Sequence, residues 1–224
     1  MIEFQRIGFE AGSFSLSEIS FKVETGTHTV LRAKTGSGKT CLLECLCGLR
    51  KVSKGQIWLG NRDVTEEPPA SRGIGYVPQD GAIFRTMKIR DQLGFGLRVR
   101  GVSQKSAQDR VDEVANLLGI TSLLDRYAKG LSGGERQRVA LGRAIAIRPK
   151  FLCIDEPLSA LDEDTRDEMI EVLMAVKQHT RATILHVSHS SYELDRLADA
   201  TLTISEGRVT PFVKTQSGKT RSES

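Results

Sequence analysis

A glycine-rich segment near the N-terminus has the residue types that bind a nucleoside triphosphate. It follows an apolar run and precedes leucines at helical spacing, and its residues are Gly36, Ser37, Gly38, Lys39 and Thr40. A strand, a glycine-rich turn and a helix in this order let successive backbone N–H groups and the helix N-terminus point at one chain of phosphates. Lys39 then reaches the β- and γ-phosphates, and the Thr40 hydroxyl ligates Mg²⁺. The segment predicts a phosphate-binding loop, although a Gly-Lys-Thr triplet alone is a common surface pattern.

One position departs from the full pattern of such a loop, because Ala33 stands where glycine is usual. An alanine held at positive φ costs on the order of 1–2 kcal/mol, whereas an extended alanine costs little. We therefore expect altered affinity rather than lost binding. Residues 217–220 repeat the letters Ser-Gly-Lys-Thr, but no strand pattern precedes them and no helix pattern follows. No second loop is expected there.

Two acidic residues, Asp155 and Glu156, follow an apolar run at 151–154. Asp155 would end a buried strand, where it could hold phosphate-bound Mg²⁺ directly or through water. Glu156 would then polarise the water that attacks the γ-phosphate, since phosphoryl transfer needs mainly positioning and charge neutralisation. Many strands end in a charged turn, so the pattern is weak alone. Downstream of a phosphate-binding lysine, it indicates a hydrolytic site.

A second anion site is indicated by the segment 131–139, which reads LSGGERQRV. Ser132 and Glu135 have capping-box spacing, so the plain interpretation is the start of a helix. Gly133 and Gly134 also clear side chains from the exposed N–H groups of that helix start, which favours an anion. Two phosphate sites with one phosphate-binding loop suggest that the second site serves a partner's nucleotide.

The elements that must position these residues alternate between strands and helices, which predicts an α/β fold with a parallel-sheet core. Alternating apolar residues over 1–31, with a strand at 56–59, predict an antiparallel sheet beside the nucleotide site. Helical patterns fill about 84–148, which we expect to be an inserted helical subdomain. Further elements are expected as a helix at 163–178 and strands at 151–154, 182–187, 201–205 and 208–213. The domain would span 1–213, and the polar residues 214–224 would be a disordered tail.

Composition sets broad limits on the class of protein. The 224 residues are 39% hydrophobic and 27% charged, with a formal charge of +4. The basic residues are scattered, which favours a solvated surface and no nucleic-acid partner. No apolar run reaches the roughly 18 residues of a membrane span, and the N-terminus lacks the pattern of a signal peptide. The four cysteines lack metal-ligand spacing and fit buried thiols in a reducing cytoplasm.

The nine residues LSGGERQRV resemble the signature motif of ATP-binding cassette (ABC) ATPases, and the resemblance covers about 2–213. It implies a P-loop NTPase with a RecA-like parallel-sheet core, an N-terminal antiparallel β subdomain and an inserted helical subdomain. It also implies ATP and Mg²⁺ as cofactors. In such proteins a head-to-tail homodimer encloses two ATP molecules at one isologous interface. Ser132, Gly133 and Gly134 would contact the γ-phosphate of ATP on the partner's P-loop.

The other motifs of the family match single residues. Gln79 matches the Q-loop glutamine, which touches Mg²⁺ or the attacking water and links the helical subdomain to the core. Asp162 ends a match to the D-loop, which crosses the dimer interface, and a helix cap is its plain interpretation. His189 matches the switch histidine that contacts the γ-phosphate. His186, inside the preceding strand, is expected in the core.

This chain differs from the family at the residue after Thr40, and two of its residues are candidates for the adenine-stacking position. Cys41 stands where threonine is usual, so side-chain help to the α-phosphate is in doubt but the backbone contact is not. The aromatic residue that stacks on adenine should lie near the first strands. Phe9 and Phe14 are both open for that role, and core packing is open for each.

The resemblance implies the separate ATPase subunit of a bacterial or archaeal transporter, on the cytoplasmic, inner face of the cell membrane. Its partners would be a second ATPase subunit, two transmembrane permease subunits and, indirectly, a substrate-binding protein. ATP would drive closure of the dimer, and hydrolysis would release it. Coupling helices of the permease would dock beside Gln79. An apolar contact and core packing are both open for the nearby residues Ala82, Ile83, Phe84 and Met87.

Part of the chain is similar to importer ATPases of the sulfate, molybdate and iron class. The similar residues are 72–79, 93–97 and Asp125, while Phe84-Arg85 replaces the usual Phe-Pro. Those relatives often carry a C-terminal regulatory domain, which is not expected here. We therefore expect ATP-driven solute import, of an oxyanion or a metal. The alternatives are an exporter or lipid-extraction ATPase and a non-transport ABC ATPase of DNA repair or translation, which typically has coiled coils, zinc insertions or two cassettes.

Overall fold

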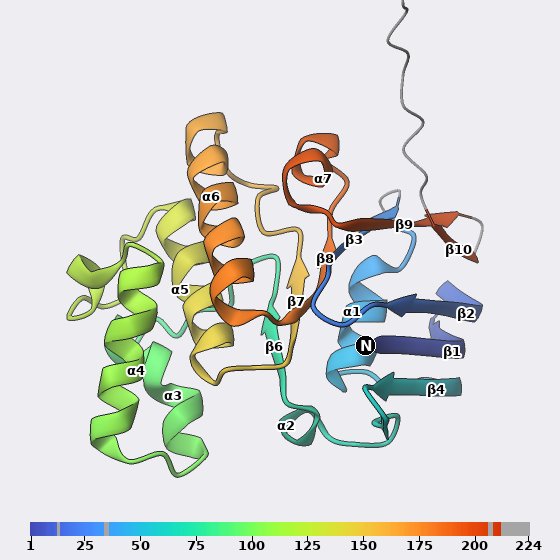
Figure 1. Cartoon of the computed structure of the whole chain (residues 1–224), viewed down its shortest axis with the longest axis horizontal. Coiled ribbons are helices and arrows are strands. Elements are labelled where there is room, and N and C mark those ends of the chain that lie inside the picture. Colours follow the sequence, from blue (N-terminus) through green and yellow to red (C-terminus); the bar gives the residue numbers. More distant parts are fainter. Residues whose placement is uncertain (13, 34–35, 206–207, 212–224) are drawn as a thin grey trace, which may run out of the picture.

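Two β-sheets enclose the helix that follows the glycine-rich segment (Figure 1). The computed structural model describes residues 1–12, 14–33, 36–205 and 208–211. The strands are β1 (Ile2–Ala11), β2 (Phe14–Val23), β3 (His28–Ala33), β4 (Lys54–Leu59), β5 (Arg62–Asp63), β6 (Ile74–Val77), β7 (Phe151–Asp155), β8 (Thr183–Val187), β9 (Ala200–Ser205) and β10 (Arg208–Pro211). The first sheet has the order β2-β1-β4-β5, and the second has the order β10-β9-β3-β8-β7-β6.

The first sheet is antiparallel, and its alternating pattern buries one face. Phe4 pairs with Phe21 across β1 and β2, and their rings stack with centroids 4.5 Å apart. The buried side chains of β1, β2 and β4 share one core with helix α1 (Lys39–Cys47). The N-terminal sheet therefore packs directly against the helix that starts in the glycine-rich segment.

The helices cover the second sheet on both faces. The helices of the described residues are α1, α2 (Pro69–Arg72), α3 (Ile89–Val99), α4 (Gln104–Leu117), α5 (Gly133–Ala146), α6 (Glu163–Thr180) and α7 (Ser191–Leu197), with a 3-10 turn at Thr121–Leu123. Cys153 and Leu185 belong to the core that contains α1, whereas Leu152, Ile154 and Ile184 belong to the core formed with α3 to α6. Because successive strand residues point to opposite faces, α1 and the α3–α6 group lie on opposite sides of the sheet (Figure 1).

Strand order brings distant segments of the chain together. β3, β8 and β7 are parallel neighbours, with His28 paired to Ile184 and Leu152 also paired to Ile184. The carboxyl ends of parallel strands meet at one edge of a sheet, where α/β proteins bind ligands. The segments that leave β3, β7 and β8 therefore converge, and they contain the glycine-rich loop, the acidic pair and His189.

The predicted α/β class with an antiparallel N-terminal sheet is confirmed, with small differences at element ends. The helix expected to reach Arg148 ends at Ala146, because Arg148 has φ +50°, which an α-helix does not allow. The helix expected to end at 178 continues to Thr180, and the strand expected from 56 begins at Lys54.

Some expectations fall on residues beyond the part described. The strand end at 212–213 and the tail at 214–224 lie outside the described residues. Helices α3, α4 and α5 lie between β6 and β7 in the chain, within the range expected for a helical subdomain. In the described ranges, no helix combines the length and the apolar character needed to cross a membrane.

Candidate active site

The glycine-rich loop requires glycine at two positions, and at one of them for a second reason. Gly36 and Gly38 have φ of +80° and +86°, a region that side chains disfavour. A Cβ at Gly38 would also lie 2.6 Å from Phe14 and 2.8 Å from Leu16, whereas one at Gly36 would meet nothing within 4 Å. The N-terminal sheet therefore supports the loop at Gly38, where α1 begins.

Ala33 does not need glycine's conformational freedom. It is the last residue of β3 and pairs with Ile204 of β9, so its backbone is extended. The more costly alternative raised by the sequence, an alanine at positive φ, is thereby excluded. Lys34 and Thr35 lie outside the described residues.

Asp155 and Thr40 form the part of the site that suits a divalent cation. Asp155 is 1% exposed, and its Oδ1 has no hydrogen-bond partner among the described residues. Burial raises the pKa of Asp155 above its usual range, and a hydrogen bond with the Thr40 side chain opposes that rise. Carboxylate and hydroxyl oxygens are ligands that Mg²⁺ prefers, and a cation would compensate the buried charge. These residues therefore fit Mg²⁺.

Glu156 lies between the side chains of Lys39 and His189, which come from other segments. Its Oε1 is 3.3 Å from the Nζ of Lys39, and its Oε2 is 3.4 Å from the Nδ1 of His189. Its backbone has φ +41°, and its N–H donates to the carbonyl of Val187 at 3.0 Å. A non-glycine residue at positive φ costs free energy and persists where the surroundings hold it. The fold thus holds Glu156 directly above the ends of β7 and β8.

Gln79 connects this acidic turn to the helices on the other face. Its Nε2 donates to the Oγ of Ser159 at 3.4 Å, and Ser159 donates to the carbonyl of Glu156 at 3.0 Å. The carbonyl of Gln79 in turn accepts from Gln137 of α5 at 2.9 Å. Gln79 is therefore linked to the acidic turn through Ser159 and is bonded directly to α5, the helix that begins in the LSGGE segment. The pairing with Gln137 was not evident from the sequence, because 58 residues separate the two.

The LSGGE segment has the predicted capping box. The N–H of Ser132 donates to Glu135 at 2.7 Å, and the N–H of Glu135 donates to the Ser132 Oγ at 3.1 Å. A Cβ at Gly134 would lie 2.5 Å from the methyl group of Thr165. Thr165 is held by Asp162, the N-cap of α6, whose carboxylate accepts from its N–H and hydroxyl, each at 3.0 Å. The structure thus brings Ser132–Gly134 and Asp162 together.

These residues and the glycine-rich loop begin helices on opposite faces of the second sheet. α5 and α6 belong to the core on one face, and α1 belongs to the core on the other. The structure therefore does not place Ser132, Gly133 and Gly134 on the same helical layer as Lys39.

The two aromatic residues considered for adenine stacking differ in burial. Phe9 is 3% exposed and packs in the N-terminal core, whereas Phe14 is half-buried and its ring lies against Gly38. Phe9 is therefore not available to a ligand.

Cys41 is half-buried in the first turn of α1, and burial raises the pKa of its thiol, so it is a neutral side chain at neutral pH. Ser37, one residue before Gly38, has a buried Oγ without a partner among the described residues.

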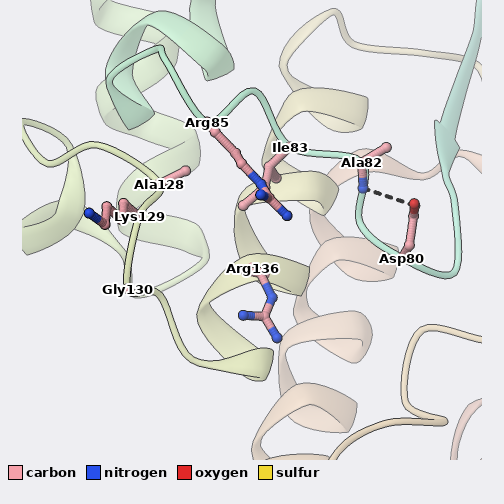
Figure 2. A pocket seen from close by; sticks show the side chains of 8 residues that line it. All are labelled: Asp80, Ala82, Ile83, Arg85, Ala128, Lys129, Gly130 and Arg136. Carbon is pink, nitrogen blue, oxygen red and sulfur yellow. Dashed lines mark hydrogen bonds between the residues drawn. The ribbon is translucent and has the colours of Figure 1, made fainter.

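A cleft of about 600 Å³ lies between the loop after β6 and the start of α5 (Figure 2). Arg85, Lys129 and Arg136 line it with positive charge. The one acidic residue of the lining, Asp80, accepts a hydrogen bond from the Ala82 N–H at 3.0 Å. In Figure 2 the Arg85 side chain extends toward α5, on the side where Arg136 lies. The cleft is therefore electropositive.

An aromatic pair lies close to this cleft in the chain. Phe84 and Phe95 are 42% and 45% exposed, with ring centroids 5.6 Å apart, and the Arg143 guanidinium lies 4.9 Å from the Phe84 ring. Ile83, expected either to dock a partner or to pack, lines the cleft and also packs against the core. Exposed aromatic rings beside a charged cleft are typical of a protein-binding surface.

A protein-family model described as ABC transporter matches residues 16–159. The chain belongs to the ABC transporter family. This confirms the resemblance seen at the LSGGE segment, and the glycine-rich loop and the acidic pair lie within the matched residues.

Curated relatives carry importer names. The chain is 40% identical to the molybdate/tungstate import ATP-binding protein WtpC of Thermococcus kodakarensis, over 88% of this chain and 59% of the relative. It is 43% identical to WtpC of Archaeoglobus fulgidus, over 81% of this chain and 75% of the relative. It is 40% identical to the sulfate/thiosulfate import ATP-binding protein CysA of Mesorhizobium japonicum, over 87% and 58%. The chain spans about three fifths of the length of several of these relatives.

The fold is that of a solved cassette. The dimeric structure of the ATP-binding cassette MJ0796 in a post-hydrolysis state, bound to ADP and Pi, superposes with a TM-score of 0.82 at 20% identity. The match covers 93% of this chain and 96% of that chain. This similarity confirms the predicted cassette fold.

The two glycines of the loop allow a matched test. Gly38→Ala should weaken MgATP binding more than Gly36→Ala does, because both substitutions place alanine at positive φ but only the first meets Phe14. We expect at least a tenfold difference in Kd, roughly 1.4 kcal/mol, measured by titration with a fluorescent ATP analogue. Equal losses in the two variants would show that contact with the N-terminal sheet does not shape the loop.

Proposed function

We propose that the chain binds and hydrolyses MgATP as the ATPase subunit of a solute importer. The observation that supports this best is the cluster of Lys39, Glu156 and His189, three residues from three segments, at one edge of the parallel strands. A carboxylate between a phosphate-binding lysine and a histidine has the composition needed to hydrolyse a phosphoanhydride.

Each residue of the site has a separate role in this proposal. Glu156 accepts a proton from a water molecule as the water oxygen bonds to the γ-phosphorus, and the bond to the bridging oxygen of ADP breaks. His189 contacts the γ-phosphate, and Lys39 leaves Glu156 to neutralise phosphate oxygens, which frees the carboxylate to act as a base. Backbone N–H groups of the loop at 36–40 and Cys41 bind the remaining phosphates.

Mg²⁺ would be held by Thr40, Asp155 and Gln79, and it would supply positive charge that offsets the charge of the phosphates. The buried, raised-pKa carboxylate of Asp155 supports this assignment, because a nearby cation favours its ionised form. Gln79 would also report the state of this site to α5 through its bond to Gln137.

The active form in this proposal is a head-to-tail dimer. Ser132, Gly133 and Gly134 begin a helix on the face of the sheet opposite the P-loop helix, so we assign them to ATP bound by a second copy. Asp162, which caps the neighbouring helix, would then also lie at the dimer interface. The dimeric state of MJ0796 bound to ADP and Pi supports this arrangement by analogy of fold.

The partners would be two permease subunits in the membrane, with this chain on the inner face. We assign their docking site to the electropositive cleft and the aromatic pair Phe84 and Phe95, because exposed aromatic rings and a positively charged lining suit a protein partner with acidic groups. The importer names of the relatives favour import, and their molybdate, tungstate and sulfate substrates favour a tetrahedral oxyanion as the solute.

Removal of the proposed base should separate ATP binding from hydrolysis. Glu156→Gln keeps the size of the side chain but cannot accept the proton, so we expect kcat to fall at least a hundredfold while MgATP still binds. The variant should form an ATP-dependent dimer in size-exclusion chromatography. A variant that hydrolyses ATP at the normal rate, or that stays monomeric at saturating ATP, would contradict the assignment.

The docking site can be tested by charge reversal. Arg85→Glu should reduce recovery of a multi-spanning membrane protein when the tagged chain is purified from detergent-solubilised native membranes. The matched control is Lys51→Glu, which reverses an exposed positive charge between α1 and β4. Equal recovery with both variants would place the docking site elsewhere, and recovery of no membrane protein by the wild-type chain would contradict the importer assignment.

A further inference from the structure

Three titratable side chains form a buried chain next to the turn that carries His189. His28 of β3, His186 of β8 and Glu193 of α7 are 0%, 0% and 4% exposed. The Nε2 of His28 is 3.1 Å from the Nδ1 of His186, and the Nε2 of His186 is 3.2 Å from the Oε2 of Glu193. These three side chains thus join two parallel strands to the helix that follows His189.

Filling part of the core with these three polar side chains costs free energy. A buried carboxylate costs free energy unless it is well paired, and an apolar substitute is often as stable. The His186–Glu193 pair is within ion-pair distance but not aligned as a hydrogen bond, and the Nδ1 of His28 has no partner among the described residues. Burial and the neighbouring His186 hold the pKa of His28 well below its usual range, so His28 is neutral. Stability alone therefore does not account for Glu193.

The backbone between His186 and Glu193 forms a closed loop, and His189 is one of its exposed residues. Ser188 is 2% exposed, its N–H donates to the carbonyl of Leu31 at 3.3 Å, and its Oγ accepts from the N–H of Ser190 at 3.0 Å. Ser190 caps α7 by accepting from the N–H of Glu193 at 3.4 Å. The Glu193 side chain then returns to His186, where the loop began.

His189 is the member of this loop that reaches the active site. Its side chain is 60% exposed and approaches Glu156 to 3.4 Å. An exposed imidazole is not fixed by packing, so its position depends on how the buried residues of the same turn hold its backbone. His28, the third member of the buried chain, begins the strand that leads into the P-loop.

We propose that Glu193 is a positioning residue for ATP hydrolysis: by holding His186, which contacts His28, it fixes the turn that places His189 beside Glu156. This inference rests on the proposed role of His189. Other charged groups nearby are accounted for separately, because Asp199 accepts from the His28 N–H at 2.8 Å and pairs with Lys177 at 2.6 Å.

The test is a double-mutant cycle between Glu193→Gln and His189→Ala. Glu193→Gln keeps the shape of the side chain and replaces its carboxyl group by an amide, and we expect kcat to fall roughly tenfold with the Kd for MgATP unchanged. In the His189→Ala background the same substitution should have no further effect, because Glu193 acts through His189. Normal kcat in Glu193→Gln, a changed Kd, or effects that multiply in the double variant would each overturn the proposal.

A matched control makes the same Glu-to-Gln change at an exposed contact of helix α7. Glu171 of α6 binds Arg196 of α7 at 2.5 Å on the surface, so Glu171→Gln should leave kcat unchanged. A fall in kcat as large as that of Glu193→Gln would mean that any loosening of α7 suffices, and would overturn the specific role of the buried chain.

Folding and the underlying role of His189 are checked in the same series. If Glu193→Gln does not fold, as judged by thermal melting, His186→Gln breaks the same contact from the strand side and should give the same loss of kcat and the same lack of effect with His189→Ala. If His189→Ala alone keeps normal kcat, the role of His189 is wrong and this proposal fails with it. The assignment of Glu156 as the base would not be affected by that result.

Discussion

The parallel pairing of β3, β8 and β7 is the constraint on which the site depends. The P-loop follows β3, Glu156 follows β7 and His189 follows β8, so adjacent strands place three distant segments at one edge. Two strands in another order would separate Lys39 from Glu156, which the structure places 3.3 Å apart. The N-terminal sheet and the helices then act on this edge from opposite faces, through Gly38 and through Gln79.

The electrostatics of this edge suit phosphate chemistry. Asp155 and Glu156 are adjacent in sequence, and burial raises the pKa of Asp155 while the Glu156 carboxyl group lies within 3.4 Å of Lys39 and His189. Two adjacent carboxyl groups in such different surroundings suit the separate roles of base and metal ligand that we propose for them. The buried side chains of His28, His186 and Glu193 lie beneath the turn that carries His189. Their burial costs free energy, and in our proposal it serves to fix the position of that turn.

Local patterns in the sequence predicted local structure well. The glycines of the P-loop, the capping box at Ser132 and the apolar run before Asp155 depend on neighbours in the chain, and each appears in the structure as the pattern indicates. Contacts between distant segments could not be read in this way. The pairing of His28 with His186, 158 residues apart, and the contact of Phe14 with Gly38 follow from strand order and sheet packing, which no local period encodes. For the same reason the sequence left Phe9 and Phe14 equally open.

The central claim is that ATP is hydrolysed between two copies of the chain, and complementation tests it most directly. Lys39→Ala removes the P-loop lysine, and Ser132→Arg blocks the segment that serves the partner's nucleotide, so each variant alone should be inactive. In a mixed head-to-tail dimer, one site combines the intact P-loop of one copy with the intact LSGGE segment of the other. Random mixing should therefore restore about a quarter of the wild-type rate, whereas a mixture as inactive as its components would contradict the shared site.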